Sequence, residues 1–319
     1  MRTYDSIPSL QRDTSVALGL FDGLHRGHQQ VISKAVSFGN GLTPSVFSFD
    51  YDNPDLVTKP DFKNLLSPTL KVRLLQTLGT EIFIHPPFSS IRDLTASCFL
   101  EEILFHSLRA KAIFCGYDYR FGRNAEGDAQ MLQKFCASHG IYCEVVPALT
   151  ENGAPISSTR IRDCIHKGEM ECAQNMLGYP YTIDFPVSQG HKLGRRLGFP
   201  TINQPYPEGN ILPRFGVYAA IAEIDGKSYM GVTNIGVKPT VGSDNAPAAE
   251  TYVIGYEGDL YGKQVPLSLI RFVRPEQQFG SVEELKQQIA RDTDEVIRIL
   301  QKNRFNKECP LVIQARQER

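Results

Sequence analysis

Two kinds of hydrophobic pattern alternate along the first half of the chain. Short apolar runs typical of buried strands occur at residues 15–18, 45–49, 81–84, 111–115 and 141–146. Between them, apolar positions at helical spacing predict helices over residues 29–36, 68–78, 95–108 and 128–138. Strands that alternate with helices form a parallel sheet covered on both faces, so the pattern predicts a doubly wound α/β domain.

The pattern changes at about residue 182, after Tyr179-Pro180-Tyr181 breaks the last helical stretch. Short β-branched runs now follow one another at 215–224, 227–232, 250–256 and 264–273. Asp225-Gly226 predicts a tight hairpin turn, and Ser281-Val282-Glu283-Glu284 predicts the start of a long helix that ends near Leu300. These features predict an antiparallel β-barrel with a terminal helix. We therefore expect two domains, residues 1–181 and 182–319.

Composition narrows the class of protein. The 319 residues carry a net charge of -1, which gives no electrostatic reason to expect nucleic acid or a membrane surface as a partner. The chain has no apolar stretch of the roughly 18 residues that span a bilayer. Its seven cysteines are scattered without a C-x-x-C pair, which favours reduced thiols in the cytoplasm over a disulfide framework or a zinc site. The sequence leaves a homo-oligomer open.

A glycine-rich decamer, G-L-F-D-G-L-H-R-G-H at 19–28, joins the first strand to the first helix. Such turns bind nucleotide phosphates, because backbone N–H groups at the start of a helix are unpaired. His25 and His28 are three residues apart, so both should lie on one face of the first helical turn. The predicted ATP-binding residues of this turn are Gly19, Phe21, Asp22, Gly23 and Gly27.

Two further segments of the first half contain candidate binding residues. In G-Y-D-Y-R-F-G at 116–122, Asp118 and the aromatic rings suit a sugar and a base, although a polar surface loop would have the same composition. In I-S-S-T-R-I-R at 156–162, hydroxyls at a helix start precede arginines, which is typical of a phosphate clamp or of an ordinary capped helix. The candidate phosphate ligands there are Ser158, Thr159 and Arg162.

The second half has its own glycine-rich segment, G-H-K-L-G-R-R-L-G-F-P-T-I-N at 190–203. Glycines at a spacing of four allow a backbone to approach phosphates closely, and the basic residues supply positive charge. Thr201 and Asn203 are two residues apart on a predicted strand, so their oxygens share one face and suit Mg²⁺. The candidate ATP ligands are Gly190, Lys192, Gly194, Arg195 and Gly198.

These motifs resemble those of a known family. The decamer and the segments at 116–122 and 156–162 are similar to the nucleotide-binding motifs of HxGH nucleotidyltransferases, in the form found in prokaryotic FAD synthetases. The G-F-P-T-I-N string resembles the riboflavin kinase signature, and the segments at 231–240, 259–262 and 274–279 resemble other parts of that kinase. The resemblance is to the prokaryotic bifunctional riboflavin kinase/FMN adenylyltransferases. One departure is Asn53-Pro54, where the family often has F-x-P-H-P.

The resemblance implies an enzyme that phosphorylates riboflavin to FMN and adenylylates FMN to FAD, with ATP as substrate and Mg²⁺ or another divalent cation as cofactor. It implies that Glu250, at the start of its strand, is the base of the kinase. It also implies that His25 and His28 hold ATP phosphates together with the hydroxyls and arginine of 156–162. Asp118 and Arg274 are the candidate flavin contacts. The alternatives are a kinase with a lost adenylyltransferase site, a non-enzymatic flavin-binding regulator, and a nucleotidyltransferase for another acceptor.

Overall fold

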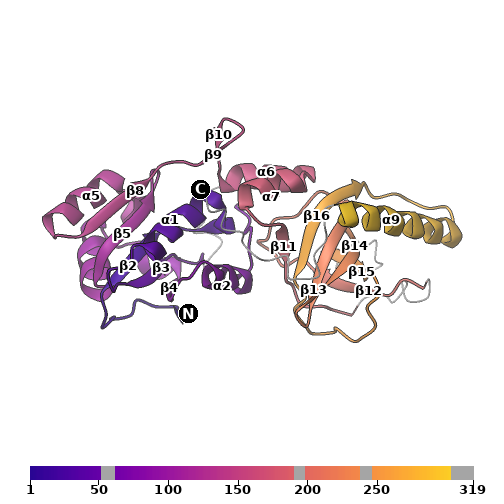
Figure 1. Ribbon diagram of the computed structural model, residues 1–319, viewed down its shortest axis with the longest axis horizontal. Helices are drawn as coiled ribbons and strands as arrows, with labels where there is room; N and C mark the ends of the chain where they lie inside the picture. Colours follow the sequence, from indigo (N-terminus) through magenta and orange to yellow (C-terminus); the bar gives the residue numbers. More distant parts are fainter. Residues whose placement is uncertain (52–61, 190–197, 238–245, 303–319) are drawn as a thin grey trace. The chain divides into compact units, whose positions relative to one another are not determined.

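The computed structural model describes residues 1–51, 62–189, 198–237 and 246–302 (Figure 1). The chain forms two compact units, which we call unit 1 and unit 2. Unit 1 contains Met1–Phe62 and Lys71–Ser157, and unit 2 contains Lys63–Leu70 and Ser158–Arg319.

Unit 1 is built on a six-stranded sheet in which every pair of neighbours is parallel. In spatial order the strands are β1 (Arg2–Tyr4), β4 (Ile82–Ile84), β3 (Thr43–Phe47), β2 (Thr14–Leu18), β5 (Ala110–Gly116) and β8 (Tyr142–Val146). The predicted doubly wound sheet is confirmed. The edge strand β1 was not predicted, because its three residues contain no apolar run.

Helices cover both faces of this sheet. On one face α1 (Arg26–Ser37) packs against β2 and β5, and the Phe38 ring at its end meets Phe114. On the other face α4 (Ala96–Cys98), the π-helix η3 (Phe99–Ser107) and α5 (Ala129–Ser138) share a buried core with Leu18 and Ile113. The sequence predicted one regular helix over 95–108. Apolar spacing identified the buried stripe there but not the π hydrogen-bond pattern.

The remaining elements of this part of the chain are short. They are η1 (Asp22–Leu24), α2 (Pro68–Thr77), α3 (Phe88–Ile91), β6 (Arg120–Phe121), η4 (Arg123–Ala125), β7 (Gly127–Asp128), β9 (Thr150–Glu151) and β10 (Ala154–Pro155). The start of α2 is as predicted, because Ser67 Oγ accepts a hydrogen bond from the Leu70 N–H at 3.1 Å.

The strand order fixes where a ligand can bind in unit 1. From β2 the chain proceeds to β3 and β4 on one side, and then returns to β5 and β8 on the other. Sheets of this kind bind ligands at the carboxyl ends of the strands where the order reverses. Here that point lies between β2 and β5, so the residues after Leu18 and after Gly116 share one edge of the sheet.

Unit 2 contains a six-stranded antiparallel sheet. In spatial order its strands are β11 (Tyr181–Ile183), β16 (Leu267–Arg274), β13 (Gly216–Ile224), β14 (Lys227–Val237), β15 (Pro247–Val253) and β12 (Thr201–Pro205). The chain beyond β11 pairs with β12 at the other edge, where Ser188 N–H donates to Asn203 O at 2.8 Å. The sheet therefore curls into the predicted barrel. Asp225 and Gly226 form the predicted turn with φ of 49° and 73°.

Among the described residues, unit 2 contains the helices α6 (Ser158–Lys167), α7 (Met170–Leu177) and α9 (Val282–Lys302). Within this unit α7 packs against β16, and α9 lies across β13, β14 and β16 (Figure 1). Under α9, Val296 and Ile299 meet Val217 and Val232 on the outer face of the barrel. The proposed boundary between residues 181 and 182 remains a prediction.

Candidate active sites

The turn between β2 and α1 has a strained backbone. Phe21, Gly23 and Leu24 have φ of 51°, 74° and 38°, so three residues of this short segment adopt left-handed conformations. The Phe21 ring is buried and lies under Gly19, where a Cβ would be 2.9 Å from the ring. Gly19 therefore makes room for Phe21. Because the ring is enclosed, the predicted contact of Phe21 with ATP would have to come from its backbone.

His25 and His28 lie together at the start of α1. His25 caps the helix, and its Nδ1 accepts a hydrogen bond from the His28 backbone N–H at 3.3 Å. The two rings stack with centroids 3.5 Å apart, and the edge of Phe21 meets His28 at 5.4 Å. Nδ1 of His28 is buried and has no hydrogen-bond partner among the residues that the structure describes. The prediction that both imidazoles share one face is confirmed.

Burial keeps both imidazoles neutral at physiological pH. It lowers the pKa of His25 to about 4. It also lowers the pKa of His28 well below its usual value, and the positive charges of His25 and Lys71 lower it further. A neutral imidazole can donate one hydrogen bond and accept another, but it brings no net charge to a phosphate. Any fixed positive charge at this turn has to come from other residues.

Lys71 supplies that charge, and sequence reasoning missed it. The side chain comes from α2, and Nζ donates to Leu20 O and to Ser48 Oγ, both at 3.1 Å. Burial lowers the pKa of Lys71, while the carboxylates of Asp50 and Asp22 oppose that shift. Lys71 lies beside the buried Leu70 in α2. In the sequence, the only indication of this role was that Lys71 directly follows an apolar position of the predicted helix.

Asp50 and His85 form a second polar pair near Lys71. His85 Nδ1 lies 2.6 Å from Asp50 Oδ2. Burial alone would raise the pKa of Asp50, but the hydrogen bond to His85 and the charges of Lys71 and His85 lower it overall. Asn53-Pro54, where this sequence lacks the histidine that the family often has, lies outside the described residues. A histidine does occur in this unit, directly after β4, although the sequence analysis did not single it out.

Asp118 lies in the turn after β5 and is exposed. Its Oδ1 would be 3.2 Å from a Cβ at Gly116, so the glycine leaves room for the carboxylate beside the strand end. Since β5 is the neighbour of β2, Asp118 lies at the same edge of the sheet as the glycine-rich turn. Its contact with flavin remains a prediction.

Ser158, Thr159 and Arg162 lie in the first turns of α6, as the sequence predicted. Arg162 Nε donates to Lys63 O at 2.7 Å, which ties α6 to the segment before α2. These residues belong to unit 2, whereas His25 and His28 belong to unit 1. Their joint action on ATP remains a prediction.

In the barrel, the strand register brings three polar side chains into one row. Asn203 of β12 lies opposite Glu250 of β15, which in turn lies opposite Asn234 of β14. Residues directly opposite one another share a face of the sheet, so all three lie on the outer face that α9 partly covers. Thr201, two residues before Asn203, is on the same face and is exposed.

The position of Glu250 corrects one expectation. β15 begins at Pro247, so Glu250 lies in the middle of its strand and has a neighbour on each side. The first residues of β15, Pro-Ala-Ala, lack the β-branched side chains from which the strand start was inferred. Asn234 was also missed as a site residue, although it lies within the segment 231–240. Its Nδ2 donates to Glu276 Oε1 at 3.3 Å.

The oxygen of the Asn203 side chain suits a hard cation. Nδ2 donates to Ser188 Oγ at 2.9 Å, which fixes the orientation of the amide. Oδ1 is buried and has no hydrogen-bond partner among the described residues. A buried oxygen without a donor is costly in a protein unless a ligand satisfies it. Together with the Thr201 hydroxyl on the same face of the sheet, it offers the oxygen ligands that Mg²⁺ prefers.

Arg274 lies at the end of β16, opposite Val217. Its guanidinium bonds Asp292 of α9, with Nε 3.0 Å from Oδ1 and Nη2 2.7 Å from Oδ2. Its role toward flavin remains a prediction.

Only one residue of the predicted phosphate loop lies among the described residues. This is Gly198, which has a φ of 86° and open space around it. The other four candidates, which are Gly190, Lys192, Gly194 and Arg195, lie outside the described residues.

The buried histidines predict a pH-dependent stability. An unfolded His25 has a pKa near 6.5 and a folded one near 4, so between these values the unfolded chain binds the proton. Stability is therefore complete above about pH 6.5 and is lost as the pH falls. His25 alone should lower the free energy of unfolding by about 2 kcal/mol between pH 7 and pH 5. Urea unfolding at both pH values measures this. A His25→Gln/His28→Gln variant should lose this part of the pH dependence of the free energy of unfolding. If the variant kept the same pH dependence as the parent protein, the histidines would not be its source.

Comparison with known proteins supports two catalytic domains. The family model described as FAD synthetase matches residues 7–160, and the one described as riboflavin kinase matches residues 177–300. The first match contains both histidines of the decamer. The second contains the row formed by Asn203, Glu250 and Asn234.

Curated relatives match most of the chain. Bifunctional riboflavin kinase/FMN adenylyltransferases of Listeria monocytogenes and Bacillus subtilis are each 34% identical to it. The alignments cover 87% and 90% of this chain and 89% and 93% of those proteins. The enzyme of Escherichia coli K12 is also 34% identical, over 88% of this chain and 91% of its own.

A solved structure shares the fold. A crystal structure described as a macrolide-efflux protein from Streptococcus pneumoniae aligns with a TM-score of 0.81 and 28% identity, over 92% of this chain and 98% of that one. Across the described residues, the helices are all too short or too polar to span a bilayer. The two domain matches and the curated relatives together show that this chain belongs to the bifunctional riboflavin kinase/FMN adenylyltransferases.

Proposed function

We propose that the two reactions occur in separate sites, with FMN made on the outer face of the barrel and FAD made at the β2–α1 turn. The observation that supports this division is that the two polar clusters belong to different compact units. Each cluster also lies within the matching domain. Riboflavin, FMN and ATP are then the ligands of this chain.

In the kinase site, Glu250 accepts the proton of the riboflavin 5′-hydroxyl as that oxygen attacks the γ-phosphorus of ATP. A carboxylate within hydrogen-bond reach of the hydroxyl suffices, because phosphoryl transfer depends mainly on positioning and charge. Asn203 and Asn234 lie on either side of Glu250 in the sheet. Thr201 and Asn203 would hold Mg²⁺, which neutralises charge on the phosphate oxygens. The loop with Gly190, Lys192, Gly194, Arg195 and Gly198 would cover the phosphates.

In the adenylyltransferase site, a phosphate oxygen of FMN attacks the α-phosphorus of ATP and pyrophosphate leaves. This reaction needs no enzyme nucleophile, so the protein contributes positioning and charge stabilisation. The buried Nδ1 of His28, which has no partner among the described residues, is available to a phosphate oxygen. His25 holds the His28 ring by stacking, and Lys71 supplies positive charge beneath the turn. The resemblance also assigns Ser158, Thr159 and Arg162 to ATP phosphates; these residues belong to unit 2, and their role stays a prediction.

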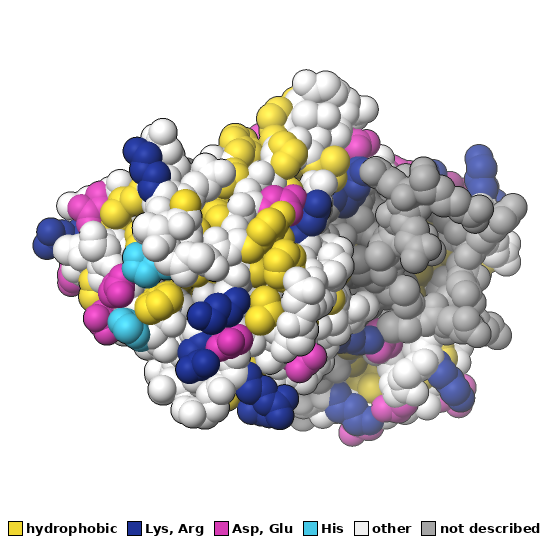
Figure 2. All heavy atoms as spheres, turned by 60° about the vertical axis from the view of Figure 1, so that its left-hand side comes forward, with side chains coloured by type: hydrophobic (Ala, Val, Ile, Leu, Met, Phe, Trp, Pro, Cys, Tyr) yellow, Lys and Arg dark blue, Asp and Glu magenta, His cyan; other side chains and the backbone are white. Residues whose placement is uncertain are grey.

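We infer a cytoplasmic protein, because its scattered cysteines suit a reducing compartment. Neither nucleic acid nor a membrane is an expected partner. Figure 2 shows lysine and arginine side chains interspersed with acidic ones on the face in view, as is typical of a surface that does not bind a polyanion.

The proposed Mg²⁺ ligand gives a testable result. Asn203→Ala should raise the Mg²⁺ concentration for half-maximal FMN formation by about tenfold or more, because it removes a metal ligand. Mg²⁺ titration of the kinase reaction measures the shift. FAD formation from FMN should keep its Mg²⁺ dependence. Ser188→Ala keeps Oδ1 but removes the hydrogen bond that orients the amide, so it should give a smaller shift in the same direction. Equal shifts in both reactions would contradict the assignment.

One assay separates the proposal from its alternatives. Purified protein is given FMN and Mg·ATP, and FAD and pyrophosphate are measured; both should appear in equal amounts. No FAD or pyrophosphate in this assay, while a parallel assay with riboflavin still gives FMN, would support the kinase-only alternative that Asn53-Pro54 raised. Tight flavin binding without ATP consumption would support a regulator.

A further inference from the structure

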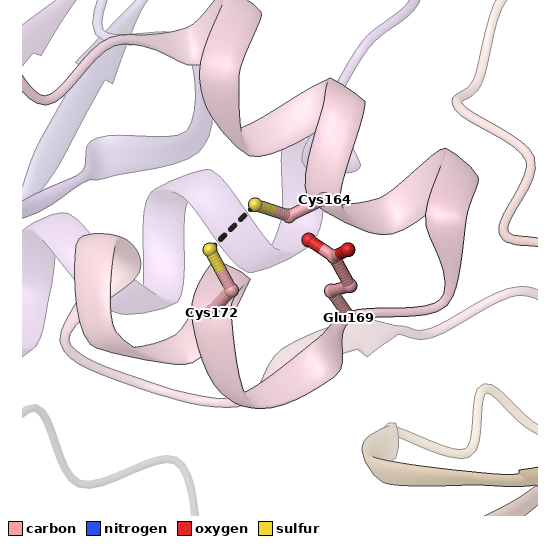
Figure 3. A group of neighbouring side chains, drawn as sticks. All are labelled: Cys164, Glu169 and Cys172. Carbon is pink, nitrogen blue, oxygen red and sulfur yellow. Dashed lines mark hydrogen bonds between the residues drawn. The ribbon is translucent and has the colours of Figure 1, made fainter.

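Two cysteines of unit 2 lie in direct contact outside both proposed sites. Cys164 is on α6 and Cys172 is on α7, and Figure 3 shows their sulfur atoms facing each other across the helix pair. The two Sγ atoms are 2.7 Å apart. Glu169, which precedes α7, points its carboxylate toward Cys164 in the same view, and one oxygen lies within 4.8 Å of both sulfurs.

The separation of the sulfurs distinguishes two possible chemistries. Two thiolates bound to one tetrahedral zinc ion lie about 3.8 Å apart, with the ion between them. The observed 2.7 Å leaves no space for an ion between the two sulfurs. A disulfide bond is about 2.05 Å long, so a shift of well under 1 Å would bring the sulfurs to bonding distance. The geometry therefore favours a disulfide over a metal.

We infer that Cys164 and Cys172 are a reversible dithiol/disulfide site that joins α6 to α7 within unit 2 when it is oxidised. A peroxide serves as the oxidant. The Cys172 sulfur attacks one peroxide oxygen, the O–O bond breaks, and a sulfenic acid and water form. The Cys164 sulfur then attacks the sulfenic sulfur, and a second water leaves with the Cys164 proton. Two thiols and one hydrogen peroxide thus give one disulfide and two waters.

The order of these steps follows from exposure. Cys172 is half-buried, whereas Cys164 is 7% exposed, so the oxidant reaches Cys172 first. Burial raises the pKa of Cys164 to about 12, and the hydrogen bond with Cys172 adds to the shift. Cys164 is therefore the thiol that resolves the sulfenic acid. In a reducing compartment the bond would be transient, as is typical of redox-sensing cysteines.

Other contacts already hold both helices in place. α7 packs on β16, and Arg271 Nε donates to Glu171 Oε1 at 2.7 Å. In α6, Arg162 Nε donates to Lys63 O at 2.7 Å, and Ile165 O accepts a hydrogen bond from the Arg214 N–H at 3.2 Å. The disulfide would therefore join two helices that are each anchored within unit 2.

The test uses the full-length protein oxidised with hydrogen peroxide. Mass spectrometry of the digest should show the peptides of Cys164 and Cys172 joined, with two hydrogens lost, and dithiothreitol should reverse the link. Cys172→Ser should be insensitive to peroxide. Cys98→Ser, which changes a cysteine of similar burial away from the pair, should respond like the parent protein.

Several results would overturn the inference. One is the absence of the link, and another is a link between Cys136 and Cys143 instead. Zinc bound by the reduced protein and lost in Cys172→Ser would assign the pair to a metal. The reduced parent protein separates this test from the proposed function: if it makes no FAD, the proposed function is wrong, whereas peptide mapping still decides whether the disulfide forms.

Discussion

Replacement of Glu250 by glutamine should leave a protein that makes FAD from FMN but no longer makes FMN from riboflavin. Glutamine keeps the size of the side chain between Asn203 and Asn234, but it cannot accept the hydroxyl proton. Loss of a general base costs about 10²- to 10⁴-fold in rate, so we expect the kinase rate to fall by that factor. Steady-state FMN formation from riboflavin and Mg·ATP measures it.

The control for this variant is Glu223→Gln, which changes another carboxylate of the same barrel, on β13. Both activities of Glu223→Gln should match those of the parent protein. If Glu250→Gln retained full kinase activity, Glu250 would not be the base. If it lost both activities while remaining folded, the division of the reactions between two sites would be wrong.

Replacement of His28 by alanine should have the opposite result. The variant removes the ring nitrogen available to a phosphate oxygen, together with the stacking on His25 and the contact with Phe21. A lost charge-stabilising hydrogen bond costs about 10²- to 10³-fold, so FAD formation should fall at least that far. FMN formation should stay at the parent rate. The measurement is FAD formation from FMN, with thermal unfolding as a check on folding.

Two further variants make this result decisive. His106→Gln changes an exposed histidine of the same unit and should keep both activities. His28→Gln keeps a polar side chain of similar length, so a loss of FAD formation there cannot be ascribed to a cavity. Normal FAD formation by both His28 variants would remove His28 from the site.

The fold was largely predictable because its signals are local. The strand–helix alternation of the first half and the Asp225-Gly226 turn follow from hydrophobic period and turn chemistry, which act over a few residues. The edge strand β1 and the π pattern of η3 were missed because neither leaves such a local signal. β1 pairs with β4, about eighty residues later in the chain, so tertiary pairing defines that strand.

The site was predictable where one short motif carries it, as in His25 and His28. It was not predictable where long-range pairing creates it. Asn234 joins Glu250 only through the β14–β15 register, and the central position of Glu250 in β15 follows from the same pairing. Lys71 of α2 contacts the decamer although it lies 51 residues after Leu20 in the sequence. The contact between Cys164 and Cys172 depends on how α6 packs on α7, which their spacing in the sequence does not reveal.

The most direct test of two separate sites mixes two variants. Glu250→Gln and His28→Ala are incubated with riboflavin and Mg·ATP, alone and together, and riboflavin, FMN and FAD are followed over time. Alone, Glu250→Gln should leave riboflavin unchanged and His28→Ala should stop at FMN. Together they should make FAD, because FMN released by one protein is a substrate for the other. A mixture that makes no FAD, although each variant keeps its own remaining reaction, would contradict independent sites.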